Sequence, residues 1–267
     1  LYMRHLLAGL ACLTVYACAS SPVSQTPKPD ELALLDGLMG NHLVLGMKTQ
    51  VKTVKNPAAL NYVQSLVIKL ADSHAALRLS KVEVVLIQPV DKKWRNFSLP
   101  GNKLYLSAKL LSKAQSESEV AAIIALELGH LVRRHVANRY TEKIRVADGE
   151  RPLLDRLLPT LSESESMELL AGINYFGADG IFDFTVQDIL DSCEDAARLL
   201  YNSNYDSRGL ASIWKTYSSL PGPSPYEAKM LELLTVKTYE IIASNAPLRN
   251  PVVRTEAFLR IQKELSK

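Results

Sequence analysis

The sequence has no large excess of charge of either sign. Its 31 Lys and Arg residues against 28 Asp and Glu residues give a formal net charge of +3. Binding to a nucleic acid depends strongly on a surplus of positive charge, so this balance argues against a nucleic-acid-binding protein. Hydrophobic residues make up 47% of the chain. This content excludes a disordered or collagen-like protein and leaves enough apolar side chains for a sizeable core.

Cysteines are also few, namely Cys12, Cys18 and Cys193. The first two lie in the N-terminal segment treated below, so Cys193 has no partner within the remaining chain. The sequence therefore predicts no structural disulfide in the monomer. We interpret Cys193 as a small buried hydrophobe rather than as a metal ligand or redox site.

The N-terminus lacks an apolar run long enough to cross a bilayer. The basic stretch Met3-Arg4-His5 precedes a mostly apolar run over residues 6–17, which is shorter than the roughly 20 residues that a spanning helix needs. A short basic stretch followed by a short apolar run is typical of a secretory signal peptide, which we expect at 1–17.

The end of this run, Val15-Tyr16-Ala17-Cys18, resembles a bacterial lipobox. The resemblance implies that Cys18 is lipidated and becomes the mature N-terminus, with residues 18–34 as a flexible tether. It also implies a position on the periplasmic side of the envelope, and Ala19 favours the outer membrane. The alternative is an ordinary signal peptide that is cleaved near Ala19-Ser20.

The rest of the chain shows no repeat and no low-complexity block apart from a short Ser/Glu run at 162–166. This pattern predicts one domain over 35–267 with a loop or insertion at 140–185. Helical spacing of apolar residues predicts helices over 31–50 and 57–72, and short apolar runs predict strands over 82–87 and 103–107. The expected fold class is α+β and mainly helical, with a small sheet.

A single long helix is predicted over 116–140. Its apolar face is strong, Glu117 and Glu119 lie in its first turn, and arginines lie near its end, which suits the helix dipole at both ends. Within it stands ALELGHLVRRH, residues 125–135. This stretch resembles the active-site helix of the HExxH zinc metallopeptidases, in the BepA-like and Oma-type branch.

Other segments share the resemblance, in the same order along the chain. Residues 95–107 resemble the family's strand segment beside the cleft, residues 197–206 resemble its ligand-bearing helix and the turn that follows, and residues 250–265 resemble its C-terminal helix. The resemblance implies a zincin-like domain whose small sheet packs on the active-site helix. It also implies a substrate groove at Leu104, Tyr105 and Leu106, where a polypeptide would pair by β-augmentation.

In an HExxH helix two His side chains one turn apart converge on one zinc ion, and the Glu between them is the general base. Here Leu126 occupies the first His position, which leaves His130 as a metal ligand beside the candidate base Glu127. On a continuous helix His135 would lie about 140° around the axis from His130. We therefore expect His135 to be a packing residue or a support for His130, not a replacement ligand.

The resemblance implies a third ligand, a Glu in the family. Ungapped comparison from Tyr205-Asp206 places it at Asp191, whereas a shifted alignment offers Glu194. The family's oxyanion-stabilising His has no counterpart in residues 220–225. Two alternatives stay open: the acidic residues on this helix form a solvated face, or a His from elsewhere, His42 or His74, folds back to complete the site.

Catalytic zinc needs three protein ligands and an open position. The first interpretation is therefore a hydrolytically impaired pseudopeptidase that is tethered to the membrane and binds polypeptide clients in envelope quality control or assembly. In this case Glu127 and His130 are a residual polar pair. The alternative is an active zinc metalloendopeptidase with a non-standard ligand set, for which zinc is the cofactor. A third hypothesis is a structural lipoprotein that uses the surface of the 140–185 insertion.

Overall fold

The computed structural model describes residues 29–77, 81–89, 96–148, 162–177, 179–219 and 224–265. The expected signal peptide, Cys18 and most of the expected tether lie outside the described residues. The helices are α1 (Pro29–Met47), α2 (Pro57–Asp72), α3 (Ala108–Lys113), α4 (Glu117–Val132), α5 (His135–Asp148), α6 (Glu163–Ala171), α7 (Val186–Asn202), α8 (Arg208–Ser218), α9 (Pro225–Ala243) and α10 (Glu256–Leu265). The strands are β1 (Val51–Thr53), β2 (Glu83–Pro89), β3 (Phe97–Leu99) and β4 (Lys103–Ser107).

The four strands form one sheet in the order β1-β2-β4-β3. β2 and β4 run parallel, while β1 and β3 pair antiparallel with their neighbours at the two edges. β3 and β4 are joined by a tight turn in which Gly101 and Asn102 have φ values of 77° and 60°. Gly and Asn tolerate this left-handed conformation best, so the sequence PGN specifies the turn.

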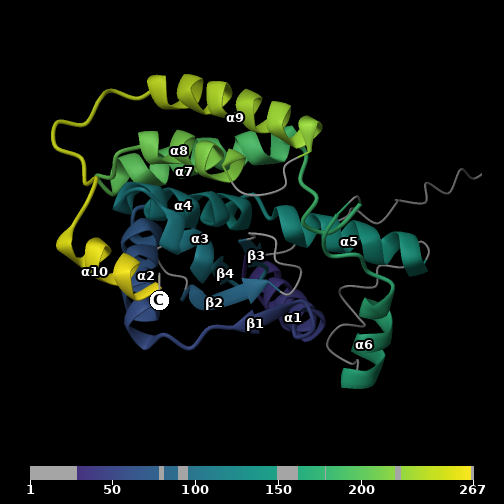
Figure 1. Ribbon diagram of the computed structural model, residues 1–267. Coiled ribbons are helices and arrows are strands. Elements are labelled where there is room, and N and C mark those ends of the chain that lie inside the picture. The colour runs from purple at the N-terminus through teal and green to yellow at the C-terminus, as the bar shows by residue number, and fades with distance from the viewer. Residues whose placement is uncertain are drawn as a thin grey trace, which may run out of the picture.

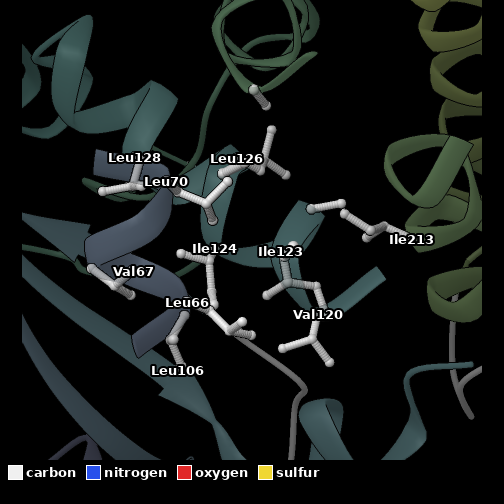
Figure 2. Packing of buried hydrophobic residues seen from close by; sticks show 14 of the residues in the cluster. Leu66, Val67, Leu70, Leu106, Val120, Ile123, Ile124, Leu126, Leu128 and Ile213 are labelled. Atoms are coloured by element: carbon white, nitrogen blue, oxygen red, sulfur yellow. The ribbon is translucent and has the colours of Figure 1, made fainter. Parts of the chain in front are cut away.

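Side chains of β4 alternate between two hydrophobic clusters, one on each face of the sheet. Leu104 and Leu106 belong to the larger cluster, in which α2, α4, α7 and α8 cover one face, and Figure 2 shows part of it. Tyr105 belongs to the second cluster, which α1, α5 and the chain between α6 and α7 form on the opposite face. Figure 1 shows the helical layers stacked on the sheet, with α9 outermost.

Helix α4 lies at the centre of this arrangement and is buried from Glu117 to His130. It begins at the N-cap Ser116, whose hydroxyl accepts from Glu119 N at 3.1 Å. It packs closely against α7 because Gly129 has no side chain: a Cβ there would lie 2.5 Å from the carbonyl oxygen of Ser192. The position of α4 relative to α7 therefore depends on this one small residue.

The α+β, mainly helical fold class is confirmed, and α2 and β4 have the predicted bounds. The single helix predicted over 116–140 is wrong. The chain leaves α4 after Val132, Arg134 takes a left-handed φ of 56°, and α5 begins at His135. Two long-range pairs hold this break: Arg133 Nε donates to Asp195 on α7 at 2.6 Å, and Arg134 Nε donates to Asp36 on α1 at 3.1 Å.

Two further boundaries differ from expectation. Residues 29–34, expected in the tether, are the first turns of α1, which has Pro29 at its start; proline suits a first helical position. The expected 140–185 loop or insertion contains the end of α5 and all of α6 among its described residues.

The close contact between α4 and α7 predicts that Gly129→Ala destabilises the protein. The new Cβ would overlap a backbone atom, which cannot rotate away, and overpacking of this kind costs about 1–3 kcal/mol. Gly37→Ala is the matched control, because a Cβ at Gly37 on α1 meets nothing within 4 Å and alanine favours a helix. Thermal denaturation should show a lower midpoint for Gly129→Ala and an equal or higher one for Gly37→Ala. Equal midpoints for Gly129→Ala and the parent would contradict the prediction.

Candidate functional site

The position of the first HExxH histidine is filled by a core side chain. Leu126 is 7% exposed and belongs to the large hydrophobic cluster, together with Ile123 of α4 and Ile213 of α8 (Figure 2). An aliphatic side chain has no lone pair to offer a metal ion. This turn of α4 therefore contributes to packing where the motif requires a ligand.

The candidate base Glu127 is buried next to β3. Burial raises its pKa to about 8, and the nearby Ser98 offsets part of this shift. Even so, neither Glu127 Oε2 nor Ser98 Oγ has a hydrogen-bond partner among the described residues. At neutral pH this buried carboxyl group is therefore mostly protonated.

Further polar groups surround this carboxyl group. Asn96 Nδ2 donates to Tyr217 Oη at 3.3 Å, and Asn96 Oδ1 accepts from the backbone of Ser107 at 2.8 Å. Burial and the nearby Glu127 carboxyl raise the pKa of Tyr217, which therefore stays a neutral phenol. Asn96 thus links the start of β3 to the end of β4 and to α8.

The structure brings His130 and His135 into direct contact, although a continuous helix would place them on different faces. Their Nδ1 atoms are 2.9 Å apart, because the helix breaks at Arg134 and the angle of a continuous helix does not apply. His130 is buried, and this burial lowers its pKa to about 3, so its imidazole is neutral. One ring donates to the other, and His135 Nδ1 also lies 3.3 Å from Ser192 Oγ.

The far side of His135 faces α7, where Nε2 lies 3.8 Å from Asp188 Oδ1. Burial is the main cause that lowers the pKa of His135, while Asp188 acts in the opposite direction. The carboxylate is placed to fix the orientation of the His135 ring, and this ring in turn holds His130. His135 therefore lies in the supporting position that the sequence analysis expected, although by a different backbone path.

The two alternatives for the third ligand are engaged elsewhere. Asp191 Oδ1 accepts from Gln187 Nε2 at 2.7 Å. Glu194 Oε2 lies 3.5 Å from Arg133 Nη2 and 3.8 Å from Arg198 Nη2 on the outer face of α7. Asp191 thus pairs with a neutral amide one turn before it on α7, and Glu194 pairs with two arginines.

The other candidates do not complete a metal site. His42 lies on α1 against Tyr140, with 3.5 Å between His42 Nδ1 and Tyr140 Oη, and His74 Nδ1 accepts from the backbone of Ala76 at 3.2 Å. Cys193 is buried, and burial raises the pKa of its thiol to about 12. Within the part of the chain that the structure describes, no group of three or more His, Cys, Asp or Glu side chains is placed to hold a metal ion. This donor set does not fit a catalytic zinc centre.

The structure corrects the expectation that β4 is the strand that pairs with a bound polypeptide. β4, with Leu104, Tyr105 and Leu106, is hydrogen-bonded to β2 on one side and to β3 on the other, so its backbone has no free edge for a polypeptide. The free edge beside α4 belongs to β3. Each of its three residues is at most 1% exposed, so other parts of the chain cover this edge.

The chain between α6 and α7, which the sequence analysis missed, packs against the Phe97 side chain of β3 and against His130. Rings of Phe176 and Phe182 lie 5.9 and 4.8 Å from the Phe97 ring, and Phe184 stacks on His130 at 4.1 Å. A sequence signal exists, because three of the five phenylalanines in the chain fall within residues 176–184. Local pattern alone does not show which surface such a cluster covers.

Comparison with known proteins shows similarity to peptidases. Residues 57–147 match the model of peptidase family M48. The beta-barrel assembly-enhancing protease of Escherichia coli K12 is 24% identical over 195 residues, which cover 68% of this chain and 39% of that protein. The corresponding protease of Yersinia pestis is 24% identical over 202 residues, with 73% and 40% covered.

The mitochondrial metalloendopeptidase OMA1 of Arabidopsis thaliana is 27% identical over 126 residues, which cover 47% of this chain and 24% of that protein. The chain spans about two fifths of the length of the beta-barrel assembly-enhancing proteases that it matches. The family match runs from the start of α2 through β2, β3, β4 and α4 into α5, so it contains both the HExxH-like helix and the edge strand β3. Residues 57–147 therefore match the M48 peptidase family, and the chain is similar to the beta-barrel assembly-enhancing proteases and to OMA1.

Proposed function

We propose that this protein is an M48-fold pseudopeptidase of the bacterial envelope, which binds polypeptides without hydrolysing them. The observation that carries the proposal is Leu126, a buried core side chain at the position where the HExxH motif requires a zinc ligand. Three protein ligands are the minimum in catalytic zinc sites. The Nδ1 atom of His130 is engaged by His135. The described side chains of α4 and α7 therefore provide fewer than three ligands for a zinc ion.

The alternative function, an active zinc endopeptidase with an unusual ligand set, is favoured by one observation. Glu127 and His130 keep the motif spacing on α4, so Leu126 is the one departure from the HExxH motif itself.

Binding of polypeptides is supported by the retained architecture. The chain keeps the sheet, the edge strand β3 and α4 in the order of the family, and its relatives include proteases named for β-barrel assembly. An edge strand can bind an extended chain through backbone hydrogen bonds without any catalytic group. We therefore propose an unfolded or assembling envelope protein as the client.

The proposed location is the periplasmic face of the outer membrane, with a lipid on Cys18 as the anchor. The lipobox-like sequence and the similarity to the beta-barrel assembly-enhancing proteases support this location. Among the helices of the described residues, none is long and apolar enough to span a bilayer.

Metal analysis tests the loss of the zinc centre. The protein purified without chelator should contain well below one zinc per chain by mass spectrometry of the metal, because Leu126 removes a ligand. Leu126→His should gain zinc, since an imidazole there lies one turn from His130 on α4. Leu126→Gln is the control, because it adds polarity without an imidazole. About one zinc per parent chain would overturn the pseudopeptidase proposal.

Stability as a function of pH tests the state of Glu127. Its pKa is about 8 in the folded protein against an ordinary value of 4.5. The folded state therefore holds more protons than the unfolded state between these values, and stability falls as the pH rises through this range. Glu127→Gln keeps the shape of the neutral acid and removes the titration. Between pH 5 and pH 8 the thermal midpoint of the parent should fall relative to that of Glu127→Gln, whereas parallel curves would show that the buried acid does not titrate there.

Membrane fractionation tests the proposed anchor. Cys18→Ala removes the only sulfur that a lipobox processing step could modify at this position, so the variant should leave the membrane fraction for the soluble periplasmic fraction. Cys12→Ala is the matched control and should fractionate like the parent. A Cys18→Ala protein that stayed with the outer membrane would contradict lipid anchoring at Cys18.

A further inference from the structure

Helix α9 presents an exposed face with a regular apolar pattern. One face of the helix packs against α7 and α8, and its buried residues are Leu231, Leu234 and Thr238. On the opposite face Leu233 is 45% exposed and Val236 is 53% exposed. Figure 1 shows α9 as the outermost helix, on the far side of α4 from the sheet. The described chain thus leaves an apolar helix face open to solvent.

This face follows a seven-residue repeat, the spacing with which two helices pack along their length. Two rows of exposed residues make up the repeat: row one is Tyr226, Leu233 and Glu240, and row two is Lys229, Val236 and Ala243. Isolated hydrophobic side chains are common on protein surfaces and need no explanation. Two rows at this spacing on one helix instead form a continuous seam, with an apolar centre and a charged residue at each side of that centre.

The seam is a fixed surface because α9 is held at its start and along its buried face. A capping box closes the first turn: Glu227 N donates to Ser224 Oγ at 3.2 Å, and Ser224 N donates to Glu227 Oε2 at 2.7 Å. On the buried face Thr238 Oγ1 accepts from Trp214 Nε1 of α8 at 2.8 Å. These contacts fix the rotation of α9 about its axis, and therefore the direction in which the seam points.

The charges on the seam are complementary to those of a second copy. When two such helices pack antiparallel, each residue of row one meets a residue of row two in the other copy. Leu233 then packs against Val236 of the second copy, and Lys229 faces Glu240 of the second copy. Two-fold symmetry forms each of these contacts twice. A parallel pair would instead place Lys229 against Lys229 and Glu240 against Glu240, and these like charges repel. The order of charges therefore favours the antiparallel arrangement.

The size of the seam limits the strength of such a contact. Helix α9 has 19 residues, so it is roughly 28 Å long. A contact between two single helices lies at the small end of specific interfaces, which are weak, and we expect a dissociation constant of about 10–100 µM. Glu240 Oε2 also accepts from Lys237 Nζ of the same helix at 2.8 Å, and a carboxylate has acceptor sites for both lysines.

We propose that the exposed face of α9 is a dimerisation surface, on which a second copy of this chain packs antiparallel with Leu233 against Val236. The inference goes beyond the proposed function and does not depend on it, because it uses neither the HExxH-like turn of α4 nor the edge strand β3. Since α9 and the sheet lie on opposite sides of α4 (Figure 1), the two sheets of such a dimer lie on its outer sides.

Reversal of the charges tests the antiparallel pairing by sedimentation equilibrium. All measurements use the full chain with Cys18→Ala, so that no lipid contributes to association. Lys229→Glu should weaken the dimer about tenfold, because like-charge pairs replace both opposite-charge pairs, and Glu240→Lys should do the same. An equimolar mixture of these two variants should dimerise again, since each supplies the charges that the other lacks. Only a contact between two copies can be restored by mixing.

Leu233→Ser tests the apolar centre of the seam and has a matched control. It should weaken the dimer at least about tenfold, because it removes two apolar contacts across the interface. Leu259→Ser on α10 removes a leucine of similar exposure, 50%, and should dimerise like the parent. Both positions are exposed, so both variants should keep the circular dichroism spectrum of the parent.

Three results would overturn the dimer. One is a parent chain that stays monomeric up to about 0.5 mM, well above the expected dissociation constant. Another is a dimer that Leu233→Ser and Leu259→Ser weaken equally, or that mixing of the two charge variants fails to restore. The last is a monomeric parent that binds reduced and carboxymethylated α-lactalbumin, a soluble unfolded polypeptide, and loses this binding in Leu233→Ser. In that case the face binds a polypeptide instead of a second copy.

Discussion

The structure depends on the complete burial of α4 between the sheet and α7. A helix buried on every side must satisfy all of its polar side chains internally, and near its start it does so. Glu119 accepts hydrogen bonds from Ser212 at 2.8 Å, Thr216 at 2.5 Å and the backbone of Gln115 at 3.1 Å. Two turns further on, Glu127 lacks a partner for one oxygen. The contrast within one helix locates the polar deficit at the turn that resembles the HExxH motif.

With Leu126 at the ligand position, this turn of α4 is held in place differently than in a zinc site. In a zinc site the metal would fix the turn, whereas here Leu126 joins the hydrophobic cluster and packing takes over this role. Burial of an apolar side chain of this size contributes about 1.5–3 kcal/mol. His130 is held by His135, which Asp188 orients from α7. The fold thus holds this turn of α4 through contacts that need no metal ion.

The sequence predicted those parts of the fold that local patterns determine. Apolar spacing after Asn56-Pro57 gave the bounds of α2, and the residues after the Pro100-Gly101-Asn102 turn gave those of β4. The break between α4 and α5 could not be predicted in this way, because it depends on Arg134 pairing with Asp36, a residue 98 positions away. For the same reason the angle argument that separated His130 from His135 failed. Which strand lies at the unpaired edge of the sheet also depends on pairing between strands that are distant in the sequence. Local sequence patterns do not specify this pairing.

The cover over β3 has a different meaning in a binding protein than in a peptidase. An exposed edge strand invites uncontrolled pairing with other chains, so proteins cover or disrupt such edges. A peptidase releases its product because the bond is cut and the fragments lose contacts. In the proposed function no bond is cut, so a client leaves by spontaneous dissociation, at a rate set by the contacts that it makes with the protein.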